Sequence, residues 1–419
     1  MVKLLVLADD FTGAFDTGVQ FVSKGASTTV VTDPNYDFDL IDKTVEVLVM
    51  VTKTRHLSPQ QAYSIVYNTA HKALQSGISY IYNKTDSALR GNAGSELAAL
   101  MDAAGVDSLP FIPALPKLNR ITKGGVHYID GIPVAQSVFG QDPFEPVLDS
   151  DVAEILGRQT SVPVVVHPKK EKNKISTPGI QLFDAETDED LLRIGNALSL
   201  KQLKFSAGCS GFAAVLADML HLQGEPPQLP ALEQALFVAC GSVNPVSLQQ
   251  MKTAQEHGFR RVHLTPIQKL EASWINREDA NACVKQWIAQ AAAEKRFILD
   301  VNDPEGQNDT DIYADQNGLT LEDLRVRISV NLAALIKKML DSGLLATLLC
   351  TGGDTLLALM QAVGVTELTP LGEMATGVVL TKFVYNSKTY HIISKSGGFG
   401  DHDLFVSLAK NLSHTANLL

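Results

Sequence analysis

The amino-acid sequence predicts an α/β protein of two lobes, each of the three-layer type with a mostly parallel sheet. Short β-branched segments alternate with helical patterns along the chain, which is typical of parallel strands covered on both faces. The 419 residues exceed what one ordinary core accommodates. Residues 221–234 are rich in Pro and Gly and have no usable period. We therefore expect one domain at residues 1–227 and another at 228–419.

The expected strands follow from apolar runs in chain order. In the first lobe they lie at residues 3–8, 27–32, 45–52, 80–85, 110–116, 162–168, 180–185 and 203–208. In the second lobe the alternation restarts at residues 235–242, 296–303 and 345–353. The final β-rich stretch, residues 377–398, contains a turn-like Asn386-Ser387 pair. It predicts an antiparallel hairpin.

Composition limits the classes of ligand. The formal net charge of −11 disfavours sequence-independent binding to nucleic acid or to an anionic membrane, both of which need a basic surface. The cysteines, Cys209, Cys240, Cys283 and Cys350, lack the spacing of a zinc site or a disulfide framework. The N-terminal residues do not resemble a signal peptide, and no run of about 18 apolar residues occurs. We expect a cytoplasmic protein with small-molecule ligands, and the sequence leaves a homo-oligomer open.

Three glycine turns follow strands in the second lobe. Gly241-Ser242 precedes Asn244 and Pro245, which suit the N-cap and first position of a helix. The second turn, residues 351–355, contains Gly352, Gly353, Asp354 and Thr355, and the third contains Gly397, Gly398 and Gly400. Glycines let a backbone approach an anion closely, and helix N-termini bind phosphate. Ordinary turn chemistry is the alternative for any one of these junctions.

These turns carry neither of the two commonest nucleotide motifs, GxxxxGK[ST] and GxGxxG. Lys395 adds a cation beside the third turn. Asp354 and Asp401 are candidate outer ligands of Mg²⁺, an ion that prefers oxygen ligands. They equally fit the role of acids that complement a helix dipole.

The strand ends of the first lobe carry side chains of a different kind. Residues 84–87, which are Lys84, Thr85, Asp86 and Ser87, end one strand, and Arg90 and Asn92 follow. Thr54, Arg55 and His56 end another strand. Such cations, acids and hydroxyls suit a small polyhydroxylated acid. The alternatives are a surface ion pair for Arg55 and a solvated loop position for His56.

Asp9 and Asp10 stand side by side where the first strand ends. Neighbouring side chains of a strand point to opposite faces, so one acid can face a ligand while the other anchors the following turn. One of the two could act as a base that activates a hydroxyl. An Asx-turn or helix cap explains one of them and leaves the other without a role.

The motifs ADDFTGAFDTG, KTDSALRGN, GSVNP, TGGDT and SKSGGFG, in this order over nearly the whole chain, resemble the four-carbon acid sugar kinases. The first two are most similar to the D-threonate 4-kinase branch. The resemblance implies a sugar-acid lobe followed by an ATP lobe, with Mg²⁺ and with an active-site cleft between the lobes. It implies substrate contacts at Asp9, Arg55 and residues 84–87. It implies ATP contacts at Ser242, residues 352–355 and Gly398.

We therefore predict transfer of a phosphoryl group to the 4-hydroxyl of D-threonate, with Asp9 as the base and Asp10 in second place. D-erythronate or a 3-oxo-tetronate are alternative substrates. Two other classes of function also stay open: a non-kinase enzyme acting on phosphorylated sugar acids, and a metabolite sensor.

Overall fold

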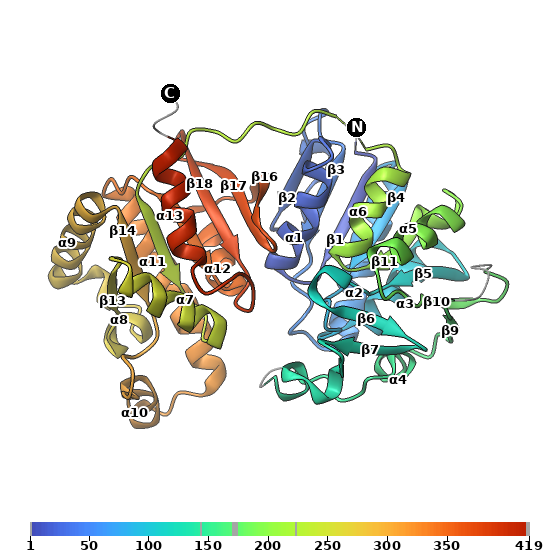
Figure 1. Cartoon of the computed structure of the whole chain (residues 1–419), viewed down its shortest axis with the longest axis horizontal. Coiled ribbons are helices and arrows are strands. Elements are labelled where there is room, and N and C mark those ends of the chain that lie inside the picture. Colours follow the sequence, from blue (N-terminus) through green and yellow to red (C-terminus); the bar gives the residue numbers. More distant parts are fainter. Residues whose placement is uncertain (1, 143–144, 170–174, 223, 416–419) are drawn as a thin grey trace. The chain divides into compact units, whose positions relative to one another are not determined.

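The structure is a computed structural model, and it describes residues 2–142, 145–169, 175–222 and 224–415. The chain divides into two compact units, Met1–Pro227 and Gln228–Leu419 (Figure 1). Both units are of the α/β class, so the fold class predicted from the sequence is confirmed. The predicted cleft between the lobes stays a prediction.

The first unit contains an eight-stranded sheet in which all paired strands are parallel, and every strand predicted for this lobe is present. From one edge to the other the strands are β2 (Thr28–Val31), β3 (Val47–Val51), β1 (Leu4–Ala8), β4 (Tyr80–Lys84), β11 (Phe205–Gly208), β5 (Ser108–Ile112), β10 (Gly179–Phe183) and β9 (Val164–His167). β1 lies inside this sheet, so the residues that follow it have strand ends on both sides.

Helices cover both faces of this sheet. They are α1 (Phe11–Val22), α2 (Pro59–Gln75), α3 (Ala93–Ala104), α4 (Val152–Gly157), α5 (Asp188–Ala197) and α6 (Ser210–Met219). Leu5 and Leu7 of β1 share a core cluster with Val66 of α2 and Leu97 of α3. The alternate residues of β1 point to the other face, because side chains alternate along a strand. There α1 packs on α6.

A small antiparallel sheet, absent from the sequence-based prediction, follows β5. It consists of β6 (Arg120–Lys123), β7 (Val126–Ile129) and β8 (Ile132–Pro133). Its strands are two to four residues long, too short to give a clear alternation in the sequence. The 3₁₀ turns of this unit are η1 (Phe38–Leu40), η2 (Pro116–Leu118), η3 (Val134–Gln136), η4 (Val138–Gln141) and η5 (Gln202–Lys204).

The second unit contains a mixed sheet. Its order is β13 (Arg260–His263), β14 (Arg296–Asp300), β12 (Leu236–Cys240), β15 (Thr347–Thr351), β18 (Lys388–Lys395), β17 (Val378–Tyr385) and β16 (Glu367–Ala375). The pairings from β13 to β18 are parallel and the last two are antiparallel. The predicted hairpin is confirmed as β17 and β18, with Asn386 and Ser387 at φ 48° and 60°.

The helices of the second unit are α7 (Pro245–Glu256), α8 (Pro266–Leu270), α9 (Glu278–Glu294), α10 (Asp309–Asn317), α11 (Leu321–Asp341), α12 (Gly353–Val363) and α13 (Leu404–Thr415), with the 3₁₀ turn η6 (Trp274–Asn276). A core cluster joins Met251 of α7, Phe405 of α13 and Ile393 of β18. Within the described parts of the chain, every helix is too short or too polar to cross a membrane.

Candidate active site

Asp9 follows β1 and is buried, with an exposed fraction of 3%. Its Oδ2 accepts a hydrogen bond from Arg55 Nε at 2.7 Å. Its Oδ1 is also buried and has no hydrogen-bond partner among the described residues. Burial raises the pKa of Asp9, although the Arg55 charge opposes that rise. The site therefore contains a buried carboxyl oxygen without a hydrogen-bond partner among the described residues.

Asp10 has a different role, as the N-cap of α1. It accepts hydrogen bonds from the Gly13 backbone at 2.9 Å and from the Thr12 hydroxyl at 2.7 Å. Arg55 NH1 donates to Asp10 at 2.9 Å. Burial tends to raise the pKa of Asp10, but the Arg55 and Lys84 charges outweigh burial and lower it. The segment expected to be a turn after these acids is the first part of a helix.

Arg55 connects three carboxylates and is itself buried, with 9% exposed. Besides Asp9 and Asp10, its guanidinium lies 3.5 Å from Asp86. The interpretation of Arg55 as a surface ion pair is therefore wrong. The loop that carries Arg55 is held by Asn92, whose Nδ2 donates to the carbonyls of Thr54 and Leu57, both at 2.8 Å.

Lys84, the last residue of β4, and the three residues that follow it, Thr85, Asp86 and Ser87, are all buried. The Lys84 ammonium donates to the Thr85 carbonyl at 2.8 Å, its one hydrogen bond within the described residues. An ammonium has three donors, so two remain for a ligand. The Thr85 hydroxyl likewise has no partner in the described parts of the chain. Asp86 accepts from Arg90 at 2.9 Å, and the Ser87 hydroxyl accepts from Arg120.

The small sheet adds residues that the sequence analysis missed. Arg120 comes from β6, and its guanidinium lies 5.1 Å from the ring centre of Phe139, as does that of Arg90. His127 of β7 bonds through Nε2 to the Ser87 carbonyl at 2.9 Å. Burial lowers the pKa of His127 to about 4, so this side chain is neutral at pH 7. The small sheet thus contacts, through Ser87, the charged cluster formed by Asp9, Asp10, Arg55 and residues 84–87.

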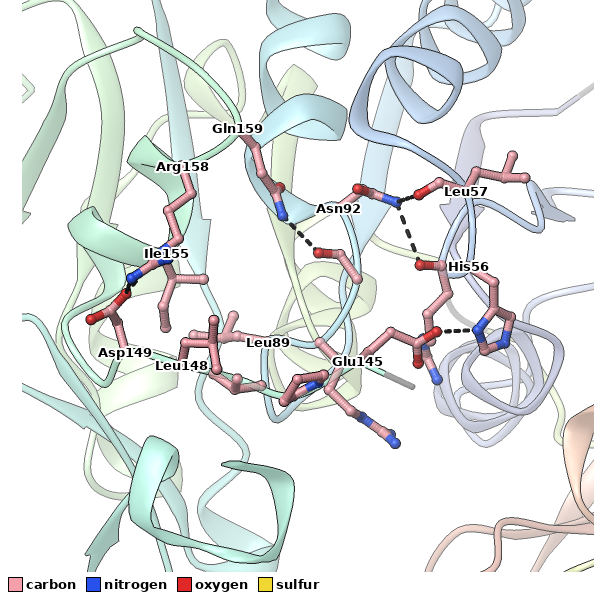
Figure 2. Close-up of a pocket in the computed structure, with 15 residues that line it drawn as sticks. His56, Leu57, Leu89, Asn92, Glu145, Leu148, Asp149, Ile155, Arg158 and Gln159 are labelled. Atoms are coloured by element: carbon pink, nitrogen blue, oxygen red, sulfur yellow. Dashed lines mark hydrogen bonds and ion pairs between the residues drawn. The ribbon is translucent and has the colours of Figure 1, made fainter. Parts of the chain in front are cut away.

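A cavity of about 280 Å³ borders the cluster (Figure 2). Arg55, Arg90 and Asn92 contribute to its wall. His56 also lines it, and its ring contacts the Glu145 carboxylate. His56 lies in a loop with 40% of its side chain exposed, which agrees with the interpretation of His56 as a solvated loop residue.

In the second unit, three loops meet at the carboxyl edge of the sheet. β15 lies between β12 and β18, with Cys240 opposite Thr351 and Thr351 opposite Lys395. The predicted glycine turns follow these residues directly. A Cβ on Gly397 would lie 2.7 Å from Ser242 Oγ, so the first and third loops touch only because this residue is glycine. The three turns therefore form one continuous backbone surface.

Two helices begin at this surface. Asn244 is the N-cap of α7 and accepts from Val246 N at 3.0 Å, with Pro245 in the first turn, as predicted. Gly352 precedes α12 with a φ of 94°, a backbone conformation that favours glycine. The free N–H groups at both helix starts make this surface suitable for an anion.

The ammonium of Lys395 holds the third glycine loop through hydrogen bonds. Lys395 is fully buried and donates to Ser247 Oγ and the Ser396 carbonyl at 3.0 Å, and to the Gly397 carbonyl at 2.9 Å. Burial lowers the pKa of Lys395 to about 8. Gln250 Nε2 adds hydrogen bonds of 2.9–3.0 Å to the loop carbonyls of residues 399–401. Ser247 and Gln250, both on α7, were not predicted.

Comparison with known proteins identifies the family. Residues 4–216 match a family model described as the sugar-binding N-terminal domain, and residues 237–405 match the nucleotide-binding C-terminal domain. The chain belongs to the four-carbon acid sugar kinase family. The two open alternatives, a non-kinase enzyme and a metabolite sensor, do not fit this family of kinases.

Relatives of this kinase family align over almost the full chain. A D-threonate kinase from Salmonella typhimurium is 28% identical over 95% of this chain and 96% of its own. A D-erythronate kinase from Heliobacterium modesticaldum is 27% identical over 96% and 95%. A 3-oxo-tetronate kinase from Cupriavidus necator is 26% identical over 97% and 96%.

Two solved structures have the same fold as this chain. A crystal structure from Salmonella typhimurium has a TM-score of 0.80 at 22% identity and covers 97% of this chain and 98% of its own. One from Haemophilus influenzae has a TM-score of 0.72 at 21% identity and covers 97% and 99%.

Asp354 and Asp401, the two acids expected near Mg²⁺, each lie beside one of the glycine turns. Asp354, in the first turn of α12, is half exposed and accepts from Arg325 NH1 at 2.8 Å. Within the described residues, no group of three His, Cys, Asp or Glu side chains could hold a metal ion. Mg²⁺ is usually held by one or two carboxylates together with substrate phosphates, and a single carboxylate beside a phosphate surface fits that pattern.

Proposed function

We propose that this four-carbon acid sugar kinase, an ATP-dependent enzyme, phosphorylates the 4-hydroxyl of D-threonate. The observation that carries the proposal is the buried and unpartnered Oδ1 of Asp9 beside the ammonium of Lys84. A hydroxyl donor and a carboxylate are the two groups that such a pair binds. The choice of D-threonate is supported by two relatives of that name, each 28% identical to the chain.

In this proposal the first unit, residues 1–227, binds the sugar acid. Lys84 donates its two remaining hydrogen bonds to the substrate carboxylate. The unpartnered Thr85 hydroxyl, with Asp86 and Ser87, binds the substrate hydroxyls. Arg55 already contacts three protein carboxylates, so we assign it mainly to the orientation of Asp9 and less to direct binding of the acid.

Asp9 acts on the attacking hydroxyl. Its Oδ1 accepts the hydrogen bond of the 4-hydroxyl and takes that proton as the oxygen bonds to the γ-phosphorus and the bond to ADP breaks. Burial raises the pKa of Asp9, which makes this carboxylate a better proton acceptor than an exposed aspartate. Asp10 stays the second choice, because its oxygens are engaged in capping α1 and in binding Arg55.

The second unit, residues 228–419, binds ATP in this proposal. The backbone of residues 352–355, the Ser242 region and Gly397-Gly398 would surround the phosphates, with helix N-termini directed at the negative charge. Mg²⁺ would enter with the phosphates and contact Asp354, and it would neutralise charge that develops during transfer.

The test is an ATP-dependent assay of ADP formation over D- and L-threonate, D- and L-erythronate and their 3-oxo forms. We expect the highest kcat/KM with D-threonate, and a ³¹P NMR product signal coupled to the C4 methylene protons. A higher kcat/KM with D-erythronate or a 3-oxo acid would replace the substrate and keep the family activity. Phosphate on another carbon would overturn the assignment of the attacking hydroxyl.

A further inference from the structure

A buried acid beside Asp9, Glu96, has no part in the function described so far. It lies in the first turn of α3 and has an exposed fraction of 2%. Its Oε1 is 2.5 Å from Thr54 Oγ1, and its Oε2 accepts from Asn83 Nδ2 at 3.2 Å. No ion pair to Glu96 occurs within the described residues at 4.0 Å or less. A buried carboxylate without such a partner is costly, whereas a neutral carboxyl group is not.

The hydroxyls next to Glu96 allow its proton to be located by counting. Thr52 Oγ1 lies 2.9 Å from the Ala8 carbonyl and 2.8 Å from Thr54 Oγ1. A carbonyl only accepts, so the single Thr52 proton goes to Ala8. The Thr54 proton must then go to Thr52. The third contact, between Thr54 and Glu96, has a proton only if Glu96 donates it.

The opposite state breaks this chain of hydrogen bonds. If Glu96 were a carboxylate, Thr54 would have to donate to it, and Thr52 would then donate to Thr54. The contact from Thr52 to the Ala8 carbonyl would have no proton. Three oxygen–oxygen contacts therefore fit three protons, one each from Thr52, Thr54 and Glu96.

The charges that face Glu96 favour the same state. Burial, and then the negative charge of Asp9 after β1, raise the pKa of Glu96 to about 7. The hydrogen bonds with Thr54 and Asn83, and then the charge of Arg55 after β3, oppose that rise. The other polar side chains near Glu96 are neutral. Asn83 on β4 donates to it, and Gln159, which follows α4, accepts from Gly94 N at the start of α3. From α2, Tyr63 donates to Asp102, more than a turn further along α3.

We propose that Glu96 is a positioning residue that stays protonated in the working enzyme and adds no negative charge of its own beside Asp9. Glu96 ties α3 through Thr54 and Thr52 to the end of β1, the residue before Asp9. Asp9 Oδ1 is thereby kept in place for the substrate hydroxyl. This inference rests on the role proposed for Asp9.

A pH limit follows from this arrangement. When Glu96 loses its proton, a further negative charge appears beside Asp9. The hydrogen bond from the Thr52 hydroxyl to the Ala8 carbonyl is lost, while the one from Thr52 N to that carbonyl, at 2.8 Å, remains. Both changes oppose the binding and reaction of an anionic acid with an anionic nucleotide. We therefore expect kcat to fall on the alkaline side, from about pH 7 in the free protein upwards.

The decisive variant is Glu96→Gln, because a glutamine is always neutral, donates to Thr54 and accepts from Asn83. At pH 6.5 and saturating substrates we expect its kcat within about threefold of wild type. Between pH 6.5 and pH 9 the kcat of the wild type should fall by roughly tenfold, while the kcat of the variant should stay unchanged. Glu154→Gln, on the exposed first turn of α4, is the matched control and should keep the wild-type profile. Loss of more than about 100-fold at every pH, or an unchanged alkaline limb, would overturn the proposal.

A second measurement needs neither substrate nor variant. Infrared difference spectra of the wild type between pH 6 and pH 9 should show a protonated carboxyl band that disappears at high pH. Labelling with ¹³C-glutamate should shift that band, which separates Glu96 from Asp9. A band that does not shift, or no band, counts against a protonated Glu96. Absence of ADP formation with every sugar acid would instead count against the proposed function and leave the infrared result standing.

Discussion

The carboxyl edges of the two sheets occupy corresponding positions in the two units, but they are built from different chemistry. After β1, β3 and β4 of the first unit, the groups at the edge are charged side chains such as Asp9, Arg55 and Lys84. After β12, β15 and β18 of the second unit, the edge is mostly backbone, with two helix starts and close glycine contacts. The same type of fold therefore presents either side chains or peptide N–H groups to a ligand.

The difference corresponds to the two ligands that the proposed function assigns. A sugar acid has hydroxyls in a fixed stereochemistry, and only side chains of defined direction distinguish them. Phosphates carry several equivalent oxygens, which peptide N–H groups at helix starts bind without charged side chains. The first edge suits selection among acids and the second suits tight positioning of an anion.

The two edges also differ in how they compensate the energetic cost of buried charges. In the first unit, buried charges occur in a network in which Arg55 meets three carboxylates, because an unpaired buried charge is strongly destabilising. In the second unit, Lys395 is buried among hydroxyl and carbonyl oxygens and its pKa falls to about 8. Removal of one charge should therefore affect the chemistry most in the first unit.

The largest effect is expected for Asp9→Asn, which keeps the size of the side chain and removes the proton acceptor. We expect kcat to fall by roughly 10²–10⁴-fold, the usual cost of losing a general base. The change is measured as initial rates of ADP formation with saturating ATP and acid, and calorimetry checks that ATP still binds. A kcat within about threefold of wild type would remove Asp9 from the chemistry.

The second edge is tested by Gly397→Ala. The added Cβ would lie 2.7 Å from Ser242 Oγ and 2.9 Å from Asn244 Cβ, so two of the three loops must separate. Loss of one or two hydrogen bonds to a charged phosphate corresponds to an increase of roughly 10–100-fold in KM for ATP. KM for the acid should change by less than about threefold. Gly157→Ala, where no atom lies within 4 Å of the added Cβ, is the control. Equal increases in both KM values would contradict the assignment of ATP to this unit.

A smaller effect is expected for Lys395→Met, which keeps the length of the side chain and removes the charge under the third loop. Because burial lowers the pKa of Lys395 to about 8, the wild-type ammonium loses its proton as the pH rises above 8. Wild-type affinity for ATP should thus fall by about tenfold between pH 7.5 and 9.5. The variant should bind weakly at both values.

Calorimetry without the sugar acid measures this effect and keeps it apart from Glu96, whose expected effect is on kcat. Lys252→Met, at an exposed ion pair with Glu305, should retain the pH dependence of the wild type. A variant that still loses affinity with an apparent pKa near 8 would assign the titration to another group.

The sequence predicts the large sheets well because their strands are buried. β1 and β3 are continuous apolar runs, and β15 has three apolar residues between two threonines. All three strands are buried at every residue. β13 was missed because its RRVH sequence is half exposed and polar, and β6 to β8 were missed because they are short. β16 was also missed, because a proline and a glycine interrupt its ELTPLGEMA sequence and it is only partly buried. The turn at Asn386 and Ser387 was found because Asn and Ser are common turn residues, and Asn adopts positive φ more readily than most residues.

The candidate site was predictable where a motif follows a strand directly. Asp9, Lys84 and Gly352 are of this kind, since a strand end and a polar residue adjoin in the sequence. Arg120 and Glu96 were missed because they come from β6 and from the first turn of α3, far along the chain from Ser87 and Thr54, which they contact. Gln250 likewise looks like any helix residue until its three loop carbonyls are seen.

The smallest effect on activity is expected for Asp10→Asn, and it sharpens the contrast with Asp9. Asparagine is as good an N-cap as aspartate, so it can still accept from Gly13 N, but it loses the charge that faces Arg55. We expect kcat within about threefold of wild type and a loss of about 1.5–3 kcal/mol in the free energy of unfolding at pH 7, typical of a hydrogen bond to a charged group. Because the folded-state pKa of Asp10 lies below its usual value, this stabilisation is fully present above about pH 4 and is lost as the pH falls through the folded pKa. Urea unfolding at pH 7 and at pH 3 should therefore show a difference between wild type and variant that narrows in acid. A fall in kcat as large as that of Asp9→Asn would exchange the roles of the two acids.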